Sequence, residues 1–385
     1  MNIDISIFKN MSDEDFLSNK FTHIYFNDYV TNKSVNCLIN EIKKANKPIT
    51  NENGAIIKPK PILIHISSYG GQVSAGMRLL SIFAMSNVPI ATMIDNYSCS
   101  AATFLSIASH YRIMTKYSFC LIHEYSLVGF IKSKQRQLKE DINLYDIYFS
   151  KIIEMYLQQT KFKEPELNEL LQHDLYLNSS YCLEKGIVDR VLNIKKEINK
   201  SIKINIYDVI NSNENNNIMI SSSDTKKQID KILFEEDIMP VILYPNREEN
   251  DNEKAKVHNT IFESLNLIPR IEKLKVPTYA IIEGPISIDD ILPMLYCDYI
   301  YMFDHSYIVC NILYFNSKSS LLLSDNIKNT ETIFNVVKTI LKEKTKMNNK
   351  MIDDINNKFS IINPTDAKKL GLCNEIITYR HYHSQ

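Results

Sequence analysis

Short apolar runs alternate with helical segments between residues 20 and 125, and this order is the feature that most narrows the possible folds of the chain. The strand-like runs occupy residues 21–26, 61–66, 89–94 and 111–114. The helical segments, which carry apolar residues at helical spacing, lie at 34–45, 73–85 and 101–108. Strands that alternate with helices form right-handed β–α–β crossovers, which set the strands parallel to one another. We therefore predict an α/β fold with a largely parallel sheet.

Charge and composition exclude several classes of protein. The 385 residues include 44 basic and 45 acidic residues, and the formal net charge of −1 argues against nucleic acid or an anionic membrane surface as a partner. No apolar run reaches the roughly 18 residues that a membrane-spanning helix needs, and the N-terminus lacks the basic and apolar regions of a signal peptide. The seven cysteines are scattered and form no C-x-x-C pair, which favours a reducing compartment without disulfides or zinc. We expect a soluble, cytoplasmic protein with no cofactor or metal.

The length of the chain predicts more than one domain, and a polar stretch marks the boundary. Residues 195–235 are rich in Asn and Ser and lack apolar periodicity, so we predict a flexible linker there. The predicted organisation is a first domain at 1–198, a polar linker at 199–235 and a second domain at 236–385. Within the first domain, a long charge-rich helix is predicted at Lys132–Gln159, and another helix begins near Pro165.

Four features of the first half form a candidate catalytic set. They are, in chain order, the Gly70-Gly71 pair after a strand, Ser100 in a turn of small residues, His123 at a strand end and Asp174 after a helix. A serine hydroxyl is a poor nucleophile until an imidazole accepts its proton, and a carboxylate fixes the tautomer of that imidazole. A glycine pair can supply a backbone N–H to the oxyanion that forms. The set predicts a serine hydrolase.

Each residue of this set also has an ordinary structural interpretation. Ser100 precedes the helical segment 101–108, where serine is a common N-cap. Taken alone, His123 is compatible with a satisfied histidine at a strand end, and Asp174 with a surface acid. Cys99 is a second candidate nucleophile, although a buried cysteine is more often a small packing residue. Only the combination of the residues favours catalysis.

The second half of the chain repeats parts of the first half in the same order. Two segments recur at an offset of 188 residues: Val88–Asp95 resembles Val276–Glu283, and Tyr111–Met114 aligns with Tyr299–Met302. A third segment recurs at an offset of 185 residues, where 184–189 aligns with 369–374. Chance similarity of short apolar strands is the alternative, but three matches in order favour duplication. At these offsets the second half replaces Ser100, His123 and Asp174 by Ile288, Asn311 and Phe359, and no glycine pair precedes its strand. We therefore predict a degenerate copy that carries no active site.

At these motifs the first half resembles the proteolytic subunit of the ATP-dependent Clp protease, within the crotonase-like superfamily. The resemblance covers roughly residues 20–195 and rests on the segments 66–76, 97–104, 120–124, 132–159 and 173–189. It implies an α/β fold, a superhelix of repeated β-β-α units, and the internal repeat predicts two tandem copies of it. It also implies that Lys132–Gln159 corresponds to the handle helix, which interdigitates opposing rings in that family.

The resemblance implies a role for each candidate residue. Ser100 would be the nucleophile, His123 the general base and Asp174 the residue that orients it. The backbone N–H groups of Gly71 and Ala101 would form the oxyanion hole.

Two departures from the family pattern concern the same site. Tyr69 stands where the family usually has proline, and we expect this change to loosen the turn. Ala101 and Ala102 replace the usual Met-Gly or Met-Ala after the serine, which keeps a backbone donor but changes the packing on the substrate side.

By resemblance, the chain would be a serine endopeptidase that hydrolyses peptide bonds of unfolded or short polypeptides and that assembles into a homo- or hetero-oligomer. The chain has no Walker-type Gly-x-x-x-x-Gly-Lys-Ser/Thr motif, so the expected partner is a separate ATP-dependent unfoldase. Two other functions stay open. One is a catalytically weak scaffold or assembly subunit, and the other is a crotonase-fold acyl-CoA enzyme, a class that does not require a Ser-His-Asp set.

Overall fold

The chain folds into two compact units. The computed structural model describes residues 5–50, 56–124, 135–193, 216–219, 229, 241–244, 260–310 and 323–378. Unit 1 comprises residues 1–193 with 321–325, and unit 2 comprises 194–320 with 326–385. The predicted domain boundary at residue 198 lies outside the described residues. Within the described ranges, no helix is long and apolar enough to cross a membrane.

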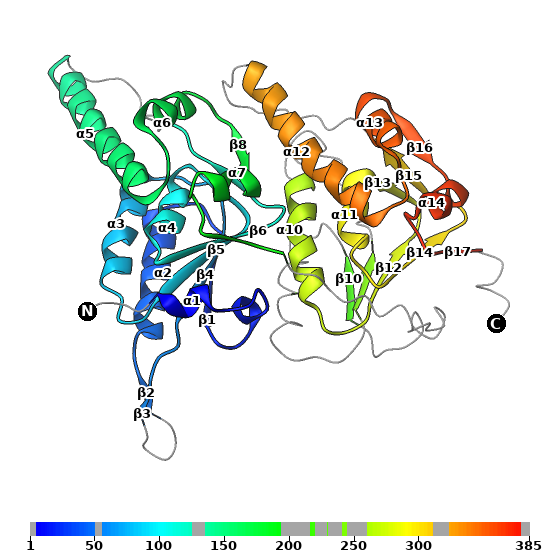
Figure 1. The fold of residues 1–385 in the computed structure, drawn as a ribbon, viewed down its shortest axis with the longest axis horizontal. Helices are drawn as coiled ribbons and strands as arrows, with labels where there is room; N and C mark the ends of the chain where they lie inside the picture. Colours follow the sequence, from blue (N-terminus) through cyan, green and yellow to red (C-terminus); the bar gives the residue numbers. More distant parts are fainter. Residues whose placement is uncertain are drawn as a thin grey trace. The chain divides into compact units, whose positions relative to one another are not determined.

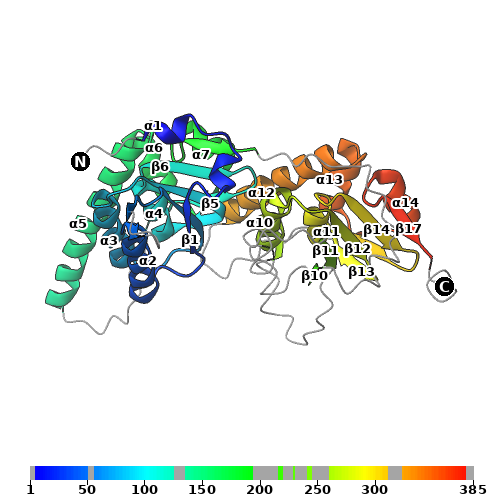
Figure 2. The ribbon, with the colours of Figure 1, turned by 90° about the horizontal axis from the view of Figure 1, so that it is seen from below.

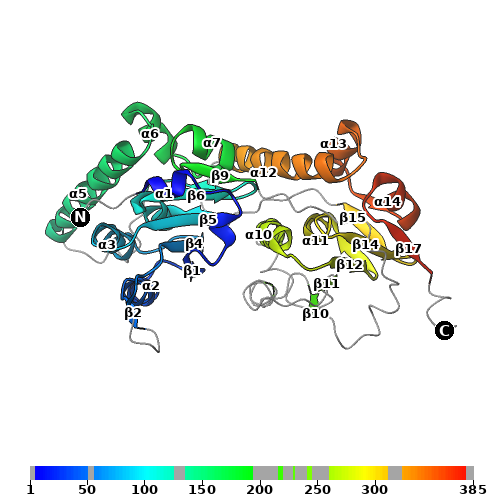
Figure 3. The ribbon, with the colours of Figure 1, turned by 60° about the horizontal axis from the view of Figure 1, so that its bottom comes forward.

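Unit 1 is built on a seven-stranded sheet whose main strands follow the order β1-β4-β5-β6-β9. Neighbouring strands along this order are parallel, and Figure 3 shows them side by side in that order. The strands are β1 (Thr22–Phe26), β4 (Ile62–Ser68), β5 (Ile90–Cys99), β6 (Tyr111–Thr115) and β9 (Arg190–Leu192). The sheet confirms the predicted α/β fold with parallel strands.

Two short strands extend this sheet where the candidate residues lie. β7 (Phe119–Leu121) pairs in parallel with the last part of β5, and β8 (Tyr176–Asn178) pairs antiparallel with β7. β5 therefore runs to Cys99, beyond its predicted end at residue 94. The polar residues of this extension are buried in the sheet: Asp95, Asn96 and Ser98.

Three helices cover one face of the sheet of unit 1. Figure 1 shows α2 (Asn32–Ala45), α3 (Val73–Ala84) and α4 (Thr103–Ala108) next to the strands. Residues of α2 at helical spacing, such as Val35 and Leu38, share one core with alternate residues of β1, β4 and β5. A 3-10 turn, η2, joins β5 to α4.

The long helix α5 (Gln135–Gln159) extends away from the body of unit 1, as Figures 1 and 2 show. Its last turns return to the core through Ile152, Met155 and Tyr156. The predicted helix at 132–159 is confirmed from residue 135, and residues 132–134 lie outside the described ranges. The other elements of unit 1 are α1 (Ser6–Lys9), η1 (Asp15–Leu17), β2 (Ile49–Thr50), β3 (Ile56–Ile57), α6 (Glu164–Leu171) and α7 (Ser179–Glu184).

Unit 2 holds a parallel five-stranded sheet in the order β10-β11-β12-β14-β17 and a three-stranded sheet in the order β13-β15-β16. The strands are β10 (Asn216–Met219), β11 (Val241–Tyr244), β12 (Thr278–Ile282), β13 (Pro285–Ser287), β14 (Tyr299–Phe303), β15 (Tyr307–Cys310), β16 (Ser360–Ile362) and β17 (Glu375–Ile377). The helices are α10 (Thr260–Lys273), α11 (Ile288–Met294), α12 (Leu323–Lys344), α13 (Asn349–Asn357) and α14 (Pro364–Leu370).

One segment of the predicted linker at 199–235 forms a strand. Residues 216–219 form β10, which pairs in parallel with β11. Their apolar pair, Ile218 and Met219, lies opposite Leu243 and Tyr244, so sheet pairing gives order to a stretch whose Asn-rich composition indicated none. The rest of the predicted linker, apart from residue 229, lies outside the described residues.

Candidate active site

Ser100 lies in a strained turn between β5 and α4. Its φ of 53° falls in the left-handed region, and it is the sole non-glycine residue with positive φ in the described part of the chain. This conformation costs an ordinary residue roughly 1–2 kcal/mol. In α/β-hydrolases, a strained strand-to-helix turn of this kind exposes the hydroxyl of a serine at the end of the sheet. The N-cap positions of η2 and α4 are Cys99 and Ala102, without side-chain caps, so Ser100 is not an N-cap.

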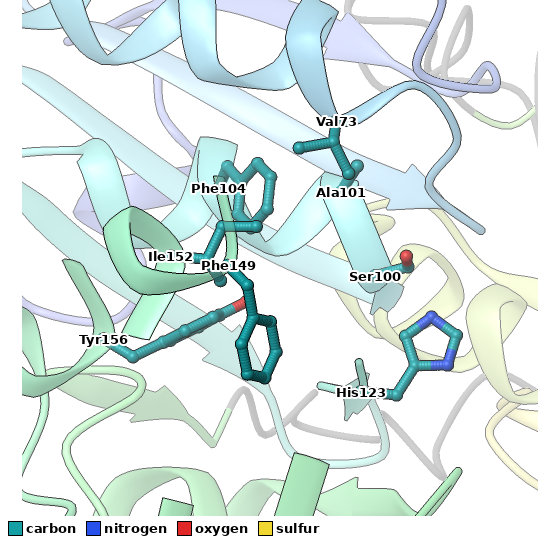
Figure 4. Close-up of a pocket in the computed structure, with 8 residues that line it drawn as sticks. All are labelled: Val73, Ser100, Ala101, Phe104, His123, Phe149, Ile152 and Tyr156. Atoms are coloured by element: carbon teal, nitrogen blue, oxygen red, sulfur yellow. The ribbon is translucent and has the colours of Figure 1, made fainter. Parts of the chain in front are cut away.

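A small cavity lies beside this turn. Figure 4 shows Ser100 and the imidazole of His123 next to each other at one end of it. The rest of the lining is mostly apolar and comes from α3, η2, α4 and α5: Val73, Ala101, Phe104, Phe149, Ile152 and Tyr156. The structure thus brings the candidate nucleophile and the candidate base to one apolar cavity.

The antiparallel pairing of β7 with β8 brings Asp174 to His123. Leu121 is the register partner of Tyr176, and two residues further along each strand His123 lies opposite Asp174. A hydrogen bond joins Nδ1 of His123 to Oδ1 of Asp174, so Nε2 of the imidazole is left for Ser100. Both side chains are partly exposed to solvent, at 28% and 32%.

The glycine pair lies beside the turn that contains Ser100. The N–H of Val30 donates to the carbonyl of Gly70 at 2.8 Å, and the N–H of Gln72 donates to the carbonyl of Val30 at 2.7 Å. Because the two ends of a planar trans peptide point in opposite directions, the N–H of Gly71 points away from Val30. A Cβ on Gly70 would lie 2.8 Å from Cβ of Ser100, so the glycine turn and the Ser100 turn are in contact.

Tyr69, which replaces the family's usual proline, is held by an aromatic contact. Its ring stacks on Tyr97 of β5 with centroids 4.1 Å apart. Burial, with Tyr97 adding to the effect, raises the pKa of the Tyr69 hydroxyl. The contacts therefore do not indicate the predicted loosening of the turn, because the stack holds Tyr69 against β5, the strand that precedes Ser100.

Cys99 is in a poor environment for a nucleophile. The residue is buried, with 4% of its surface exposed. Burial raises the pKa of the thiol well above its usual range, and the nearby Cys120 adds to this effect. Because the thiolate is the reactive form, the structure favours a packing role for Cys99.

The sequence did not predict which residues line the cavity, although three of them follow a pattern that marks a buried helix face. Phe149, Ile152 and Tyr156 follow helical spacing along α5, which is the pattern of a buried helix face. Thr103 had no such signal. Its hydroxyl donates to the carbonyl of Ser100 and contacts the hydroxyl of Tyr156, which is distant in the sequence.

Residues 52–195 match a family model described as Clp protease. Proteolytic subunit 1 of the ATP-dependent Clp protease from Protochlamydia amoebophila is 28% identical over 141 residues, which cover 36% of this chain and 68% of that protein. Subunit 1 from Chlamydia trachomatis serovar D is 26% identical over 173 residues, covering 44% of this chain and 85% of that protein. Among solved structures, a mutant of ClpP1 from Listeria monocytogenes aligns with a TM-score of 0.39 and 13% identity, over 47% of this chain and 95% of that one.

The matched segment contains the glycine pair, Ser100, His123 and Asp174. The resemblance found from the motifs and the family model therefore point to the same region of the chain. Unit 1 of this protein is ClpP-like, similar to the proteolytic subunits of the ATP-dependent Clp protease.

Proposed function

We propose that unit 1 is a serine endopeptidase that hydrolyses peptide bonds of unfolded or short polypeptides through Ser100, His123 and Asp174. The observation that carries the proposal is the arrangement around the cavity. Ser100 and His123 lie next to each other there, and Asp174 is hydrogen-bonded to Nδ1 of the imidazole, which leaves Nε2 for Ser100. This is the order of contacts that activates a serine for acyl transfer.

In the proposed reaction, Nε2 of His123 accepts the proton of the Ser100 hydroxyl as Oγ attacks the carbonyl carbon of the peptide bond. The N–H groups of Gly71 and Ala101 donate to the oxyanion of the tetrahedral intermediate. His123 then gives its proton to the leaving amine, and the C–N bond breaks to leave an acyl-enzyme. Water, deprotonated by the same imidazole, hydrolyses the ester and restores Ser100. Asp174 holds the imidazole in the tautomer that accepts at Nε2.

The cavity supports a polypeptide substrate with an apolar side chain next to the scissile bond. Phe104, Phe149 and Ile152 present apolar atoms beside Ser100 and His123, so a hydrophobic side chain would lose its water-exposed surface there. We infer that peptides with a large apolar residue on the acyl side are cleaved faster than those with a charged one.

Relatives of this chain are named as subunits of an ATP-dependent protease. We propose by this similarity that the protein works as an oligomer and receives its substrates from a separate ATP-dependent unfoldase, because this sequence has no Walker-type phosphate-binding motif of its own.

We also propose that unit 2 is a degenerate copy of unit 1. The offsets of 188 and 185 residues map the paired residues Leu121 and Tyr176 onto Val309 and Ile361, and these two residues pair in the same antiparallel manner between β15 and β16. The order of the parallel strands supports the same relation, since β4-β5-β6-β9 corresponds to β11-β12-β14-β17.

A repeated hydrogen-bond motif next to the last strand of each unit supports duplication further. In unit 1 the N–H of Arg112 donates to Asp189, and the N–H of Asp189 donates to the carbonyl of Arg112. In unit 2 Ile300 and Asn374 make the corresponding two bonds. Unit 2 carries Ile288 and Phe359 at the positions of Ser100 and Asp174, and Asn311, at the position of His123, lies outside the described residues. Its proposed role is therefore structural.

Labelling with a fluorophosphonate tests the proposed activity. We expect the wild-type protein to be labelled and to cleave a short fluorogenic peptide, and Ser100→Ala to lose both, because loss of the nucleophile in such enzymes lowers kcat by about 10⁶-fold. Ser98→Ala is a matched control, since this buried serine near the end of β5 has no hydrogen-bond partner among the described residues. Its labelling should equal that of the wild type.

The same assay separates the alternatives. Unchanged peptide turnover by Ser100→Ala would exclude the serine mechanism. No labelling of the folded wild-type protein would favour the scaffold function, and hydrolysis of an acyl-CoA thioester in preference to a peptide would favour the crotonase-like alternative.

A further inference from the structure

Thr103, the first residue of α4, links the nucleophile turn to the long helix α5. Its hydroxyl lies 2.6 Å from the carbonyl oxygen of Ser100 and is hydrogen-bonded to the hydroxyl of Tyr156. Both side chains are buried, with 0% and 2% of their surface exposed. Water therefore does not compete for the two hydroxyl groups, and each hydroxyl proton is donated to an acceptor within the protein.

The direction of the two hydrogen bonds follows from the number of protons. A carbonyl oxygen can only accept, so the single hydroxyl proton of Thr103 goes to Ser100. The hydroxyl of Thr103 must then accept from Tyr156, which donates its own proton. Burial raises the pKa of Tyr156, so this donor keeps its proton at any ordinary pH.

The carbonyl of Ser100 belongs to the same peptide group as the N–H of Ala101. Because that group is planar and trans, a carbonyl held on the α4 side turns the N–H to the opposite side. The backbone nitrogen of Ala101 lies 3.0 Å from the point where a Cβ on Gly70 would be, so this side faces the glycine turn. A hydrogen bond accepted by a carbonyl also polarises the N–H of the same amide and makes it a stronger donor.

The N–H of Gly71 is held in the same way. The carbonyl of Gly70, in the same peptide group, accepts from the N–H of Val30 at 2.8 Å. Both candidate oxyanion donors therefore belong to peptide groups whose carbonyls accept hydrogen bonds. The carbonyl of Gly70 accepts from the N–H of Val30, and the carbonyl of Ser100 accepts from both the backbone N–H and the hydroxyl of Thr103, which is itself bonded to Tyr156.

We propose that Thr103 and Tyr156 are positioning residues, which orient and polarise the N–H of Ala101 as an oxyanion donor and hold Ser100 in its left-handed conformation. This inference rests on the proposed serine-hydrolase function and adds to it two residues that never touch the substrate's reacting atoms. They act on the transition state through the peptide group between Ser100 and Ala101.

The test compares labelling rates and peptide kinetics of four variants, Thr103→Val, Thr103→Ser, Tyr156→Phe and the double variant Thr103→Val with Tyr156→Phe. We expect Thr103→Val to lower the labelling rate and kcat by about 10-fold, a fraction of the roughly 10²–10³-fold effect of deleting an oxyanion donor. KM should stay within about twofold, because the interaction is made in the transition state. Thr103→Ser should restore the wild-type rate, since it restores the hydroxyl.

Tyr156→Phe keeps the ring that lines the cavity and removes only the hydroxyl, and we expect about a threefold to 10-fold loss of kcat. Because Tyr156 acts through Thr103, the double variant should be no slower than Thr103→Val alone. The midpoint of the pH–rate profile should not move in any variant, as His123 is untouched. Thr92→Val and Tyr111→Phe are the control variants. Each removes a buried hydroxyl of unit 1 that is not part of the Ser100 turn, and both should keep wild-type rates.

Several outcomes would overturn the inference. They are wild-type rates in folded Thr103→Val, failure of Thr103→Ser to rescue, a double variant whose loss is the product of the two single losses, or a loss seen only in KM. If Thr103→Val does not fold, Tyr156→Phe and Thr103→Ser decide between the same outcomes. A folded wild-type protein that is not labelled overturns the proposed function and this inference together, whereas a labelled wild type with fully active variants overturns the inference alone.

Discussion

Gly70 lies so close to the Ser100 turn that no side chain fits between them. A Cβ there would lie 2.4 Å from the carbonyl oxygen of Cys99, and the φ of Gly70 is +91°. We predict that Gly70→Ala lowers the unfolding free energy of unit 1 by about 3 kcal/mol, from backbone strain and overpacking together. It should also abolish fluorophosphonate labelling, because relief of the clash moves the glycine turn away from Ser100. Urea unfolding and the labelling rate measure the two effects.

Gly186→Ala is the control substitution, because it introduces backbone strain but no steric clash near Ser100. Gly186 also has a positive φ, +66°, and the nearest atom to its added Cβ would be Cγ of the flexible Lys161 side chain at 3.1 Å. We expect a loss of about 1 kcal/mol and an unchanged labelling rate. Equal effects of the two substitutions on labelling would contradict the close packing proposed at Gly70.

His110 lies in the loop between α4 and β6, and its side chain forms a hydrogen bond with the start of β5. The N–H of Ile90 donates to Nδ1 of His110 at 3.1 Å, a bond that the imidazole makes with an unprotonated Nδ1. Burial lowers the pKa of His110. The unfolded chain therefore takes up a proton near its ordinary pKa of about 6.5 before the folded chain does, so stability is fully present above this pH and declines as the pH falls below it.

His110→Asn tests this pH dependence, since the amide oxygen of Asn can accept from Ile90 but does not titrate. We predict that the unfolding free energy of the wild type falls relative to that of His110→Asn between about pH 7.5 and about pH 5.5. Urea unfolding at several pH values gives the difference. A difference that stays constant across this range would show that His110 does not couple folding to protonation.

At the scale of the whole molecule, each unit has a hydrophobic core of its own. Leu79 belongs to the large core of unit 1 and Ile281 to a cluster in unit 2, and both are 0% exposed. We predict two unfolding transitions. Leu79→Ala should lower the midpoint of one and Ile281→Ala that of the other, each through a loss of about 3 kcal/mol from the cavity left behind.

Labelling during the same urea titration identifies the transition of unit 1, because the candidate site lies wholly in that unit. Labelling should disappear with the transition that Leu79→Ala shifts and persist through the one that Ile281→Ala shifts. One cooperative transition, shifted equally by both substitutions, would show that the two units fold as one.

The order of strands and helices in unit 1 could be predicted from the sequence, because apolar periodicity is a local property. Buried strands and amphipathic helices each show it over a few residues, and β1, β4, β6, α2 and α3 begin and end within about two residues of the predicted bounds. The residue types of the candidate set were visible for a similar reason, since Ser100, His123 and Asp174 lie at ends of such elements.

Contacts between distant segments were decided by the tertiary structure. The continuation of β5 to Cys99 depends on pairing with β7, and the place of Asp174 beside His123 depends on the register of β7 with β8. The stack of Tyr69 on Tyr97 and the hydrogen bond of Thr103 with Tyr156 join residues far apart in the chain. No spacing rule reports such pairs, because they form only when whole strands and helices have packed and their side chains meet across the core.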